Sequence, residues 1–267
     1  MKIIILLIAI INIPVIALNA QEKIDIVYIA NDGFLISGRS QKILIDALPN
    51  NSFGEYDVPS DKLREQITEG RPPFGKIDMC LVTHMHGDHF YGPYINGFMK
   101  IHKETQFVSS PQVNEQLSRE STSGKKIITV DQKLGSITDT IIANIPLKIY
   151  RTKHAGDSTG NLAVNLAYLM TVDNFKVLHI GDGPFTYNRP EFENFHLEKE
   201  HIDILFLDDF GFTEDARIYI NEVIKPRYII AMHISLKELE TELKKFHEVF
   251  PNSFVYERPM ESKTFSK

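Results

Sequence analysis

The sequence contains a single cysteine, Cys80, so no intramolecular disulfide can form. Cys80 lies within the largely apolar run Ile77–Val82, and a free cysteine in such a setting is usually a small buried hydrophobe. No dense block of Lys and Arg appears, and the formal net charge is −6. Because phosphate contacts need clustered cations, this composition argues against nucleic-acid binding. It leaves an anionic small molecule open as a substrate, since a bound metal can supply local positive charge.

The sequence also lacks repeats, low-complexity stretches and a Pro/Gly/Ser-rich linker, which favours one domain over residues 21–267. The first residues differ from the rest: a basic residue precedes the almost unbroken apolar run Ile3–Leu18, and the small residue Ala20 precedes a polar stretch. This pattern is typical of a secretory signal peptide. We therefore expect a signal peptide over residues 1–20 and an exported protein, periplasmic or secreted, without stable membrane insertion after cleavage; an uncleaved anchor is the alternative. Without disulfides, an exported protein relies on its core and on any bound metal.

Hydrophobic alternation and turn residues divide the remaining sequence into predicted elements. The predicted strands are Lys23–Ala30, Gly33–Ser37, Lys42–Asp46, Ile77–Thr83, Gln106–Ser109, Lys126–Val130, Ser136–Ile141, Pro146–Lys153, Leu162–Thr171, Phe175–Ile180, Ile202–Leu207, Tyr228–Ala231 and Ser253–Tyr256. The predicted helices are Ser60–Glu69, Tyr94–Glu104, Ser110–Arg119, Thr213–Val223 and Ser235–Val249. Strands dominate early and strand–helix alternation comes late, which favours an α+β fold of two sheets with helices on their outer faces.

Four ligand-type side chains stand within six residues, directly after a predicted apolar strand. They are His84, His86, Asp88 and His89. Residues two apart on an extended segment point to the same side, so His84 and His86 can bind one ion together. Gly87 permits a tight turn, after which Asp88 and His89 can face a neighbouring point. Imidazole and carboxylate suit zinc, iron and similar metals, so the run predicts a metal site; a chance cluster of surface histidines is the alternative.

The run Thr83–His89, with the pattern H-x-H-x-D-H, resembles the metal-binding motif of the metallo-β-lactamase superfamily of hydrolases. The resemblance implies a four-layer αββα sandwich with two mixed sheets and metals at one edge of both sheets. It also implies three later ligands in a set order: a His, a bridging Asp and a last His. His154, Asp182 and His233 each follow a predicted strand in that order.

Carried over by position, the resemblance implies two divalent metal ions as cofactors, zinc above all, with manganese or iron as alternatives. One ion is assigned to His84, His86 and His154, the other to Asp88, His89 and His233, with Asp182 bridging them. Such a pair polarises a substrate oxygen and lowers the pKa of a bridging water toward 7, so that a bridging hydroxide attacks. Asp88 is the implied catalytic residue, which orients the hydroxide and carries a proton. Asp46 stands where family members carry an Asp that supports the ligands, unless it is only a strand-end turn residue.

Other side chains have weaker interpretations. His179 is expected to lie in the core or to support the ligands. Residues that line a pocket or simply belong to loops are Tyr91, Ser158, Asn161 and Asp209, and residues that wall a pocket or fill the core are Phe210 and Phe212. Histidines expected on the surface are His102, His196, His201 and His247.

The expected ligand set narrows the function. A bridging Asp182 argues against β-lactam opening, which stays an alternative, and favours lactonases, thioesterases and phosphodiesterases. Residues Tyr28–Ile36 and Phe107–Val113 resemble the subgroup of L-ascorbate-phosphate lactonase and N-acyl-phosphatidylethanolamine phospholipase D. We therefore expect hydrolysis of a small-molecule ester, lactone or phosphodiester. The alternatives are a mononuclear iron oxidoreductase of the persulfide-dioxygenase type and a binding protein that keeps metals without turnover; the oligomeric state stays open.

Overall fold

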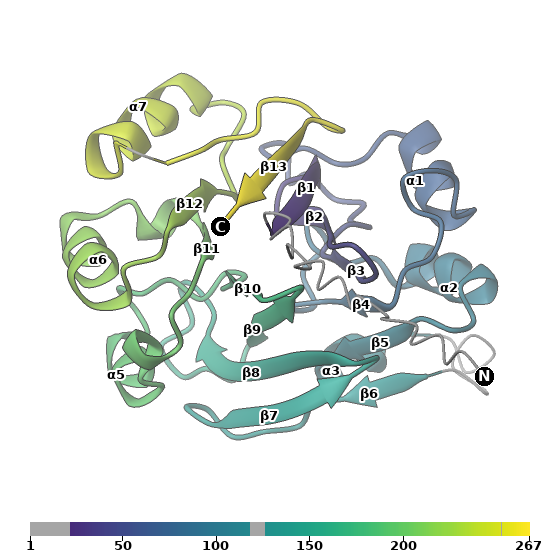
Figure 1. Ribbon diagram of the computed structural model, residues 1–267, viewed down its shortest axis with the longest axis horizontal. Helices are drawn as coiled ribbons and strands as arrows, with labels where there is room; N and C mark the ends of the chain where they lie inside the picture. Colours follow the sequence, from purple (N-terminus) through teal and green to yellow (C-terminus); the bar gives the residue numbers. More distant parts are fainter. Residues whose placement is uncertain (1–21, 118–125, 252) are drawn as a thin grey trace, which may run out of the picture.

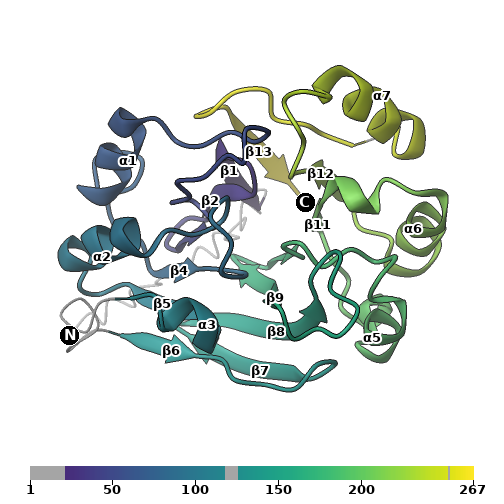
Figure 2. The same cartoon turned by 180° about the vertical axis from the view of Figure 1, so that it is seen from behind.

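The computed structural model describes residues 22–117, 126–251 and 253–267, and it confirms the predicted α+β class and the αββα layers. Two sheets lie side by side in the middle, with helices on the outer side of each (Figure 1), and the view from behind shows the same arrangement (Figure 2). The predicted signal peptide, residues 1–20, lies outside the described residues. Within the described ranges, no helix combines the length and the apolar character that crossing a membrane would require.

The first sheet has seven strands and is mixed, as predicted. In spatial order they are β13 (Ser262–Ser266), β1 (Lys23–Ala30), β2 (Gly33–Ser37), β3 (Lys42–Ile45), β4 (Met79–Leu81), β5 (Gln106–Ser109) and β6 (Ile127–Thr129). The pairs from β13 to β3 are antiparallel, and the pairs from β3 to β6 are parallel. The carboxyl ends of β3 and β4 therefore meet at one edge, where the chain carries Asp46 and the histidine-rich run.

The second sheet has six strands and is also mixed. Their order is β12 (Tyr228–Ala231), β11 (Ile204–Leu207), β10 (Phe175–His179), β9 (Val164–Val172), β8 (Ile145–Lys153) and β7 (Ile137–Ile142). The pairs β12–β11 and β11–β10 are parallel, and the pairs from β10 to β7 are antiparallel. Because β8, β10 and β12 run the same way, the three segments after them lie at one edge.

Helices bury their apolar faces against the outer sides of the sheets. Alongside the first sheet run α1 (Asp61–Thr68) and α2 (Gly92–Ile101), and after β5 comes α3 (Pro111–Asn114). Alongside the second sheet run α5 (Arg189–Asn194), α6 (Glu214–Tyr219), which continues into a π-helical turn at Ile220–Ile224, and α7 (Leu239–Val249). Short 3-10 turns lie at Leu197–Lys199 and Asp209–Gly211. One core cluster fills the space between the sheets and reaches under α6 and α7, and a second packs α1 and α2 onto the first sheet.

Several predictions at the chain level need correction. The expected strand Ser253–Tyr256 forms only one bridge, between Phe254 and Ile230, because the chain there crosses from the second sheet to the first. Its continuation adds β13 to the edge of β1, a strand that the sequence did not predict. Helix α7 begins at Leu239 rather than at Ser235. Cys80 is buried and unpaired, as expected.

Candidate metal site

The structure brings all seven predicted ligands together at one edge of the two sheets. His84, His86, Asp88 and His89 follow β4 of the first sheet. His154, Asp182 and His233 follow β8, β10 and β12 of the second sheet. The segments that follow strands leave the apolar core and carry polar side chains. Predicted ligands separated by up to 149 positions (233 − 84) therefore come together at this edge of the sheets.

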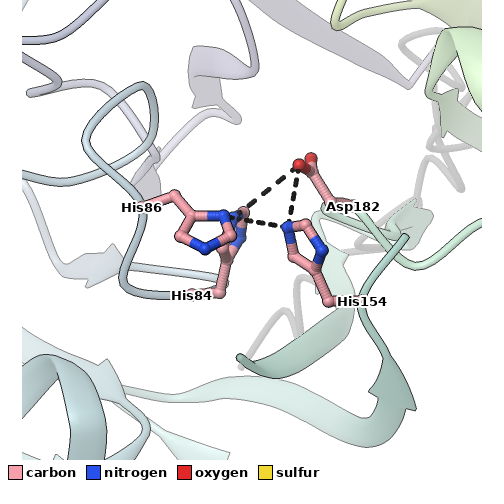
Figure 3. Close-up of side chains that lie close together, drawn as sticks. All are labelled: His84, His86, His154 and Asp182. Carbon is pink, nitrogen blue, oxygen red and sulfur yellow. Dashed lines mark hydrogen bonds and ion pairs between the residues drawn. The ribbon is translucent and has the colours of Figure 1, made fainter. Parts of the chain in front are cut away.

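Three histidines and Asp182 form a first group whose ring nitrogens converge (Figure 3). His84 Nε2 lies 3.1 Å from His86 Nδ1 and 3.2 Å from His154 Nε2. Asp182 Oδ2 lies 3.2 Å from His154 Nε2 and 3.7 Å from His84 Nε2. Four donors that each lie 2.0–2.2 Å from a tetrahedral zinc ion are about 3.4 Å from one another, so these spacings suit one ion.

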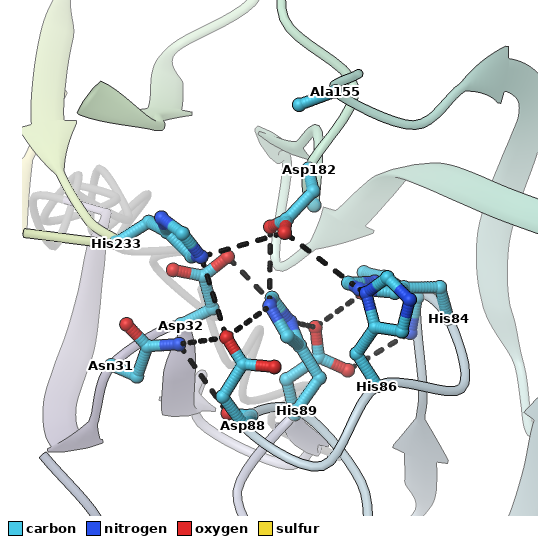
Figure 4. A network of polar contacts seen from close by, with 12 residues as sticks. Asn31, Asp32, His84, His86, Asp88, His89, Ala155, Asp182 and His233 are labelled. Atoms are coloured by element: carbon cyan, nitrogen blue, oxygen red, sulfur yellow. Dashed lines mark hydrogen bonds and ion pairs between the residues drawn. The ribbon is translucent and has the colours of Figure 1, made fainter. Parts of the chain in front are cut away.

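Asp88, His89 and His233 form a second group beside the first (Figure 4). Asp88 Oδ2 lies 3.6 Å from His89 Nε2 and 3.4 Å from His233 Nε2. Asp182 reaches this group as well: its Oδ1 lies 3.1 Å from His89 Nε2, and its Oδ2 lies 3.4 Å from His233 Nε2. Asp182 therefore stands between the two groups.

The other ring nitrogen of most of these histidines is held by the protein. Partners of Nδ1 are Thr83 Oγ1 for His84 (3.1 Å), Ala155 O for His154 (2.6 Å), Asp46 Oδ2 for His89 (3.0 Å) and Asp209 Oδ1 for His233 (3.3 Å). Such contacts fix the tautomer and aim Nε2 of each ring at the common point. This is the arrangement that metal-binding histidines show.

Burial and charge also fit a cation. Burial by itself would raise the pKa of Asp182, but the neighbouring His233, His89 and His84 hold it well below its usual value. Asp88 Oδ1, His89 Nε2 and Asp182 Oδ1 are buried without a well-formed hydrogen bond among the described residues, and the last two face each other at 3.1 Å. Unpaired buried polar atoms are costly, and ligation of a divalent cation satisfies all three at once. The side chains present therefore fit divalent metal, and they form two neighbouring groups.

Asp46 supports the motif from the end of β3. Its carboxylate accepts hydrogen bonds from Thr83 N (2.9 Å) and Thr83 Oγ1 (2.5 Å), and it holds His89 Nδ1. Asp46 adopts a φ of 43°, a left-handed conformation that Asp and Asn tolerate better than most residues. The predicted supporting role therefore has a geometric basis.

Replacing Asp46 with Asn is expected to weaken zinc binding about 10- to 100-fold, the usual cost of losing a supporting contact to a ligand. The amide keeps the size and the backbone conformation but removes the negative charge beside His89. Competition with a chelating dye measures the affinity. The matched control is Asp139→Asn on β7, where the side chain is 68% exposed. Wild-type affinity in Asp46→Asn would remove Asp46 from the support of the site.

The predicted turn at Gly87 is present, since His89 N and Phe90 N both donate to His86 O, but another contact requires glycine there. A Cβ at Gly87 would lie 2.8 Å from Asn51 Cβ, closer than side chains pack. Its φ is not in the left-handed region, so close approach rather than a tight turn requires glycine. The segment that contains Asn51 thus lies directly against the histidine motif.

Three further residues at the site were not predicted. Asn31 Nδ2 donates to Asp88 O (3.3 Å), and Asp32 is fully buried with Oδ2 3.6 Å from His89 Nδ1 (Figure 4). The ring of Tyr56 lies 4.3 Å from that of His233, and burial foremost raises the pKa of its hydroxyl to about 12. Asn31 and Asp32 lie between the predicted strands Lys23–Ala30 and Gly33–Ser37, and this place directly after a strand was the available signal.

The remaining predicted residues have mixed outcomes. His179 is buried in the core, as expected, and its Nε2 lies 3.0 Å from Asp32 O. The expectation for His102 is wrong: it is buried against Phe98 and its Nε2 lies 3.2 Å from Ile67 O. The histidines confirmed as exposed are His196, His201 and His247.

The residues predicted to line a pocket also differ in where they lie. Ser158 and Asn161 are exposed, and Tyr91 is half-buried against Tyr94. Phe212 is buried in the core, whereas Phe210 is 38% exposed, with its ring 5.3 Å from that of His233. Of these residues and Asp209, only Phe210 and Asp209 contact a ligand side chain among the described residues.

Comparison with known proteins agrees with this geometry. The beta-lactamase superfamily domain matches residues 25–233, a span that begins in β1 and ends on the last predicted ligand. A UPF0173 protein of Pyrococcus abyssi is 29% identical over 216 residues, covering 78% of this chain and 82% of that protein. A UPF0173 metal-dependent hydrolase of Pyrococcus furiosus is 26% identical over 215 residues, covering 79% and 84%.

The fold has solved counterparts. Igni18, a metallo hydrolase from Ignicoccus hospitalis, superposes with a TM-score of 0.63 at 16% identity, over 91% of this chain and 98% of that one. At this identity the likeness concerns the fold alone. The family match spans most of the chain and includes every predicted ligand. The chain therefore belongs to the metallo-β-lactamase superfamily of metal-dependent hydrolases.

Proposed function

We propose that the protein is a dinuclear hydrolase that binds two divalent metals, preferably zinc, and cleaves a small ester, lactone or phosphodiester. The observation that carries this proposal is the position of Asp182. Its two oxygens lie 3.1–3.7 Å from imidazole nitrogens of both groups, the spacing of a carboxylate that serves two ions. A site for a single ion would not need the second group, Asp88, His89 and His233.

The chain's own residues divide the work of hydrolysis. When bound, two cations supply Lewis acidity and a water with a pKa near neutrality. Asp88 is placed to handle the proton: Oδ2 faces His89 and His233, while Oδ1 is buried without a hydrogen-bond partner among the described residues. Asn31 fixes the Asp88 backbone from the side. Asp88 Oδ1 can accept a proton from the attacking water and deliver it to the leaving group.

The alternative functions fit less well. A mononuclear iron oxidoreductase would need only the first group, yet Asp88, His89 and His233 are all buried and convergent. A β-lactamase with a Cys ligand would need a thiol at the site, and Cys80 is buried in β4, inside the first sheet. The preference for ester and phosphodiester substrates rests on the bridging position of Asp182.

The test is a substrate panel with protein reconstituted with zinc or manganese. We expect two ions per chain by metal analysis and turnover of at least one of bis-p-nitrophenyl phosphate, a lactone and a thioester, with nitrocefin uncleaved. One iron per chain together with oxygen uptake on glutathione persulfide would support the oxidoreductase instead. A protein that holds two metals but hydrolyses none of the panel would contradict the proposal.

Asp88→Asn is expected to leave the protein folded and to lower the turnover number about a hundredfold, the usual contribution of a positioned proton carrier. Asn keeps an oxygen that can face the second group but cannot carry a proton at neutral pH. The measurement pairs turnover with metal analysis, so that loss of an ion is distinguished from loss of proton transfer. Full activity in this variant would exclude Asp88 from the mechanism.

A further inference from the structure

The loop between β3 and α1, residues 47–60, crosses the site and is called the strap. Near its start, the backbone amides of Asn50 and Asn51 both donate to Gly87 O at 3.0 Å. Further along, Leu236 N donates to Glu55 O at 2.7 Å. The strap is therefore fastened at one point to the histidine motif and at another to the segment after His233.

Side chains reinforce this position. Asn51 packs where a Cβ of Gly87 would be, and Glu55 forms an ion pair with Lys237 at 3.3 Å. Within the strap, Tyr56 N donates to Ser52 O at 2.9 Å and closes a turn. Tyr56 thus directly follows backbone that is hydrogen-bonded to Gly87 and Leu236, and its own amide is bonded to Ser52 O, which fixes its place at the site.

Two aromatic rings, one from each half of the fold, lie beside His233 of the second group. Tyr56 comes from the strap of the first sheet, and its ring lies 4.3 Å from that of His233. Phe210 comes from the 3-10 turn after β11 of the second sheet, and its ring lies 5.3 Å from His233. Tyr56 is half-buried and Phe210 is 38% exposed, so both rings keep a free surface beside a polar cluster. The Tyr56 hydroxyl has no hydrogen-bond partner in the part of the chain that the structure describes.

We propose that Tyr56 and Phe210 form a substrate subsite next to His233, which receives a flat apolar group of the substrate while Tyr56 Oη donates a hydrogen bond to a substrate oxygen. The inference rests on the proposed dinuclear function and adds the substrate class: an ester, lactone or phosphodiester with an aryl or similarly flat apolar substituent next to the bond that is cleaved. Aromatic rings around a few convergent polar groups are how pockets combine affinity with orientation. A ring that is left partly exposed beside ligands gains free energy when a ligand covers it.

Phenylphosphonate and methylphosphonate are suitable probes, because they present the same phosphonate oxygens to metal ions and differ in the apolar group. Calorimetric titration of the zinc-loaded full-length protein gives both dissociation constants without any turnover. We expect phenylphosphonate to bind about tenfold more tightly, since the phenyl group gains contacts with two aromatic rings and buries apolar area that methylphosphonate leaves exposed.

Variants separate the two parts of the subsite. Phe210→Ala is expected to reduce the preference for the phenyl group to about threefold or less, because one ring contact is lost. Tyr56→Phe is expected to weaken both probes about fivefold and to leave their ratio unchanged, because it removes one hydrogen bond but keeps the ring. Phe53→Ala is the matched control: Phe53 lies on the same strap with 57% exposure. Phe210→Leu replaces Phe210→Ala if the latter fails to fold.

The outcomes distinguish this inference from the proposed function. Equal affinity for the two phosphonates, or an unchanged ratio in Phe210→Ala and Phe210→Leu, would overturn the subsite while leaving the dinuclear site intact. An unaltered affinity in Tyr56→Phe would overturn the role of the hydroxyl. If a protein with two zinc ions per chain bound neither phosphonate, both the subsite and the proposed hydrolytic site would be contradicted.

Discussion

Removal of the metals by a chelator is expected to lower the melting temperature of the protein by about 15–30 °C. An ion that binds only the folded state contributes about 4 kcal/mol when its free concentration is a thousand times its dissociation constant. Two ions give about 8 kcal/mol, and each kcal/mol shifts the midpoint of a chain of this size by about 2–4 °C. The structure gives the reason for this expectation: four carboxylates, those of Asp32, Asp46, Asp88 and Asp182, are buried around the site.

Asp32 shows the cost most clearly, because Asp182 and Asp46 add like-charge repulsion to the effect of its burial. Burial is the main cause that raises the pKa of the Asp32 carboxyl. Neither of its oxygens is hydrogen-bonded to a described residue. The measurement is differential scanning calorimetry of zinc-loaded protein with and without EDTA, and restoring zinc in excess over the chelator is the control. A shift below about 5 °C, with metal analysis confirming removal, would show that the ions contribute little to folding.

The sequence predicted the ligands because their signals are local. His84 to His89 stand at alternate or adjacent positions after a strand, so side-chain direction follows from the period of two. His154, Asp182 and His233 each follow a predicted strand, and the family's order then singled them out. Two sheets with outer helices were predictable from the apolar runs of the buried strands, whereas the mixed character of the sheets was implied by the family resemblance.

What the sequence did not predict depends on contacts between distant segments. Strand β13 carries polar residues at alternate positions and is recognisable only by its pairing with β1, more than 200 positions earlier (262 − 30 = 232). His102 lies in a polar stretch at the end of a predicted helix and was expected on the surface, yet it stacks on Phe98 and its Nε2 lies 3.2 Å from Ile67 O of α1. The sequence around Tyr56 gives no sign that its ring lies beside His233. The hydrogen bonds that the preceding part of the strap makes to Gly87 and Leu236 determine this position. Tertiary contacts decide all three cases.

Asp182→Asn is expected to lower the metal content below two ions per chain and to reduce hydrolysis on the order of a thousandfold or more, since Lewis-acid catalysis contributes several kcal/mol and each 1.4 kcal/mol is a factor of ten. Within the described part of the chain, Asp182 is the one side chain whose oxygens approach ring nitrogens of both groups. An amide offers one neutral oxygen in place of two that share a negative charge, so it cannot serve both ions. The backbone at this position should persist, because Asp182 N donates to Asn165 Oδ1 (3.2 Å) and Asp182 O accepts from Ala155 N (2.7 Å).

The comparison of Asp182→Asn with Asp46→Asn makes this test specific to bridging. Both variants remove one buried carboxylate charge near His89, but Asp46 touches only Nδ1 of that ring, on the side away from the cluster. If charge alone mattered, the two variants would lose metal to the same extent. If Asp182 bridges, Asp182→Asn retains at most one ion at a zinc concentration that still fills both positions of Asp46→Asn. Two tightly held ions in Asp182→Asn, with turnover near that of the wild type, would contradict the bridging position and with it the main support for the dinuclear hydrolase.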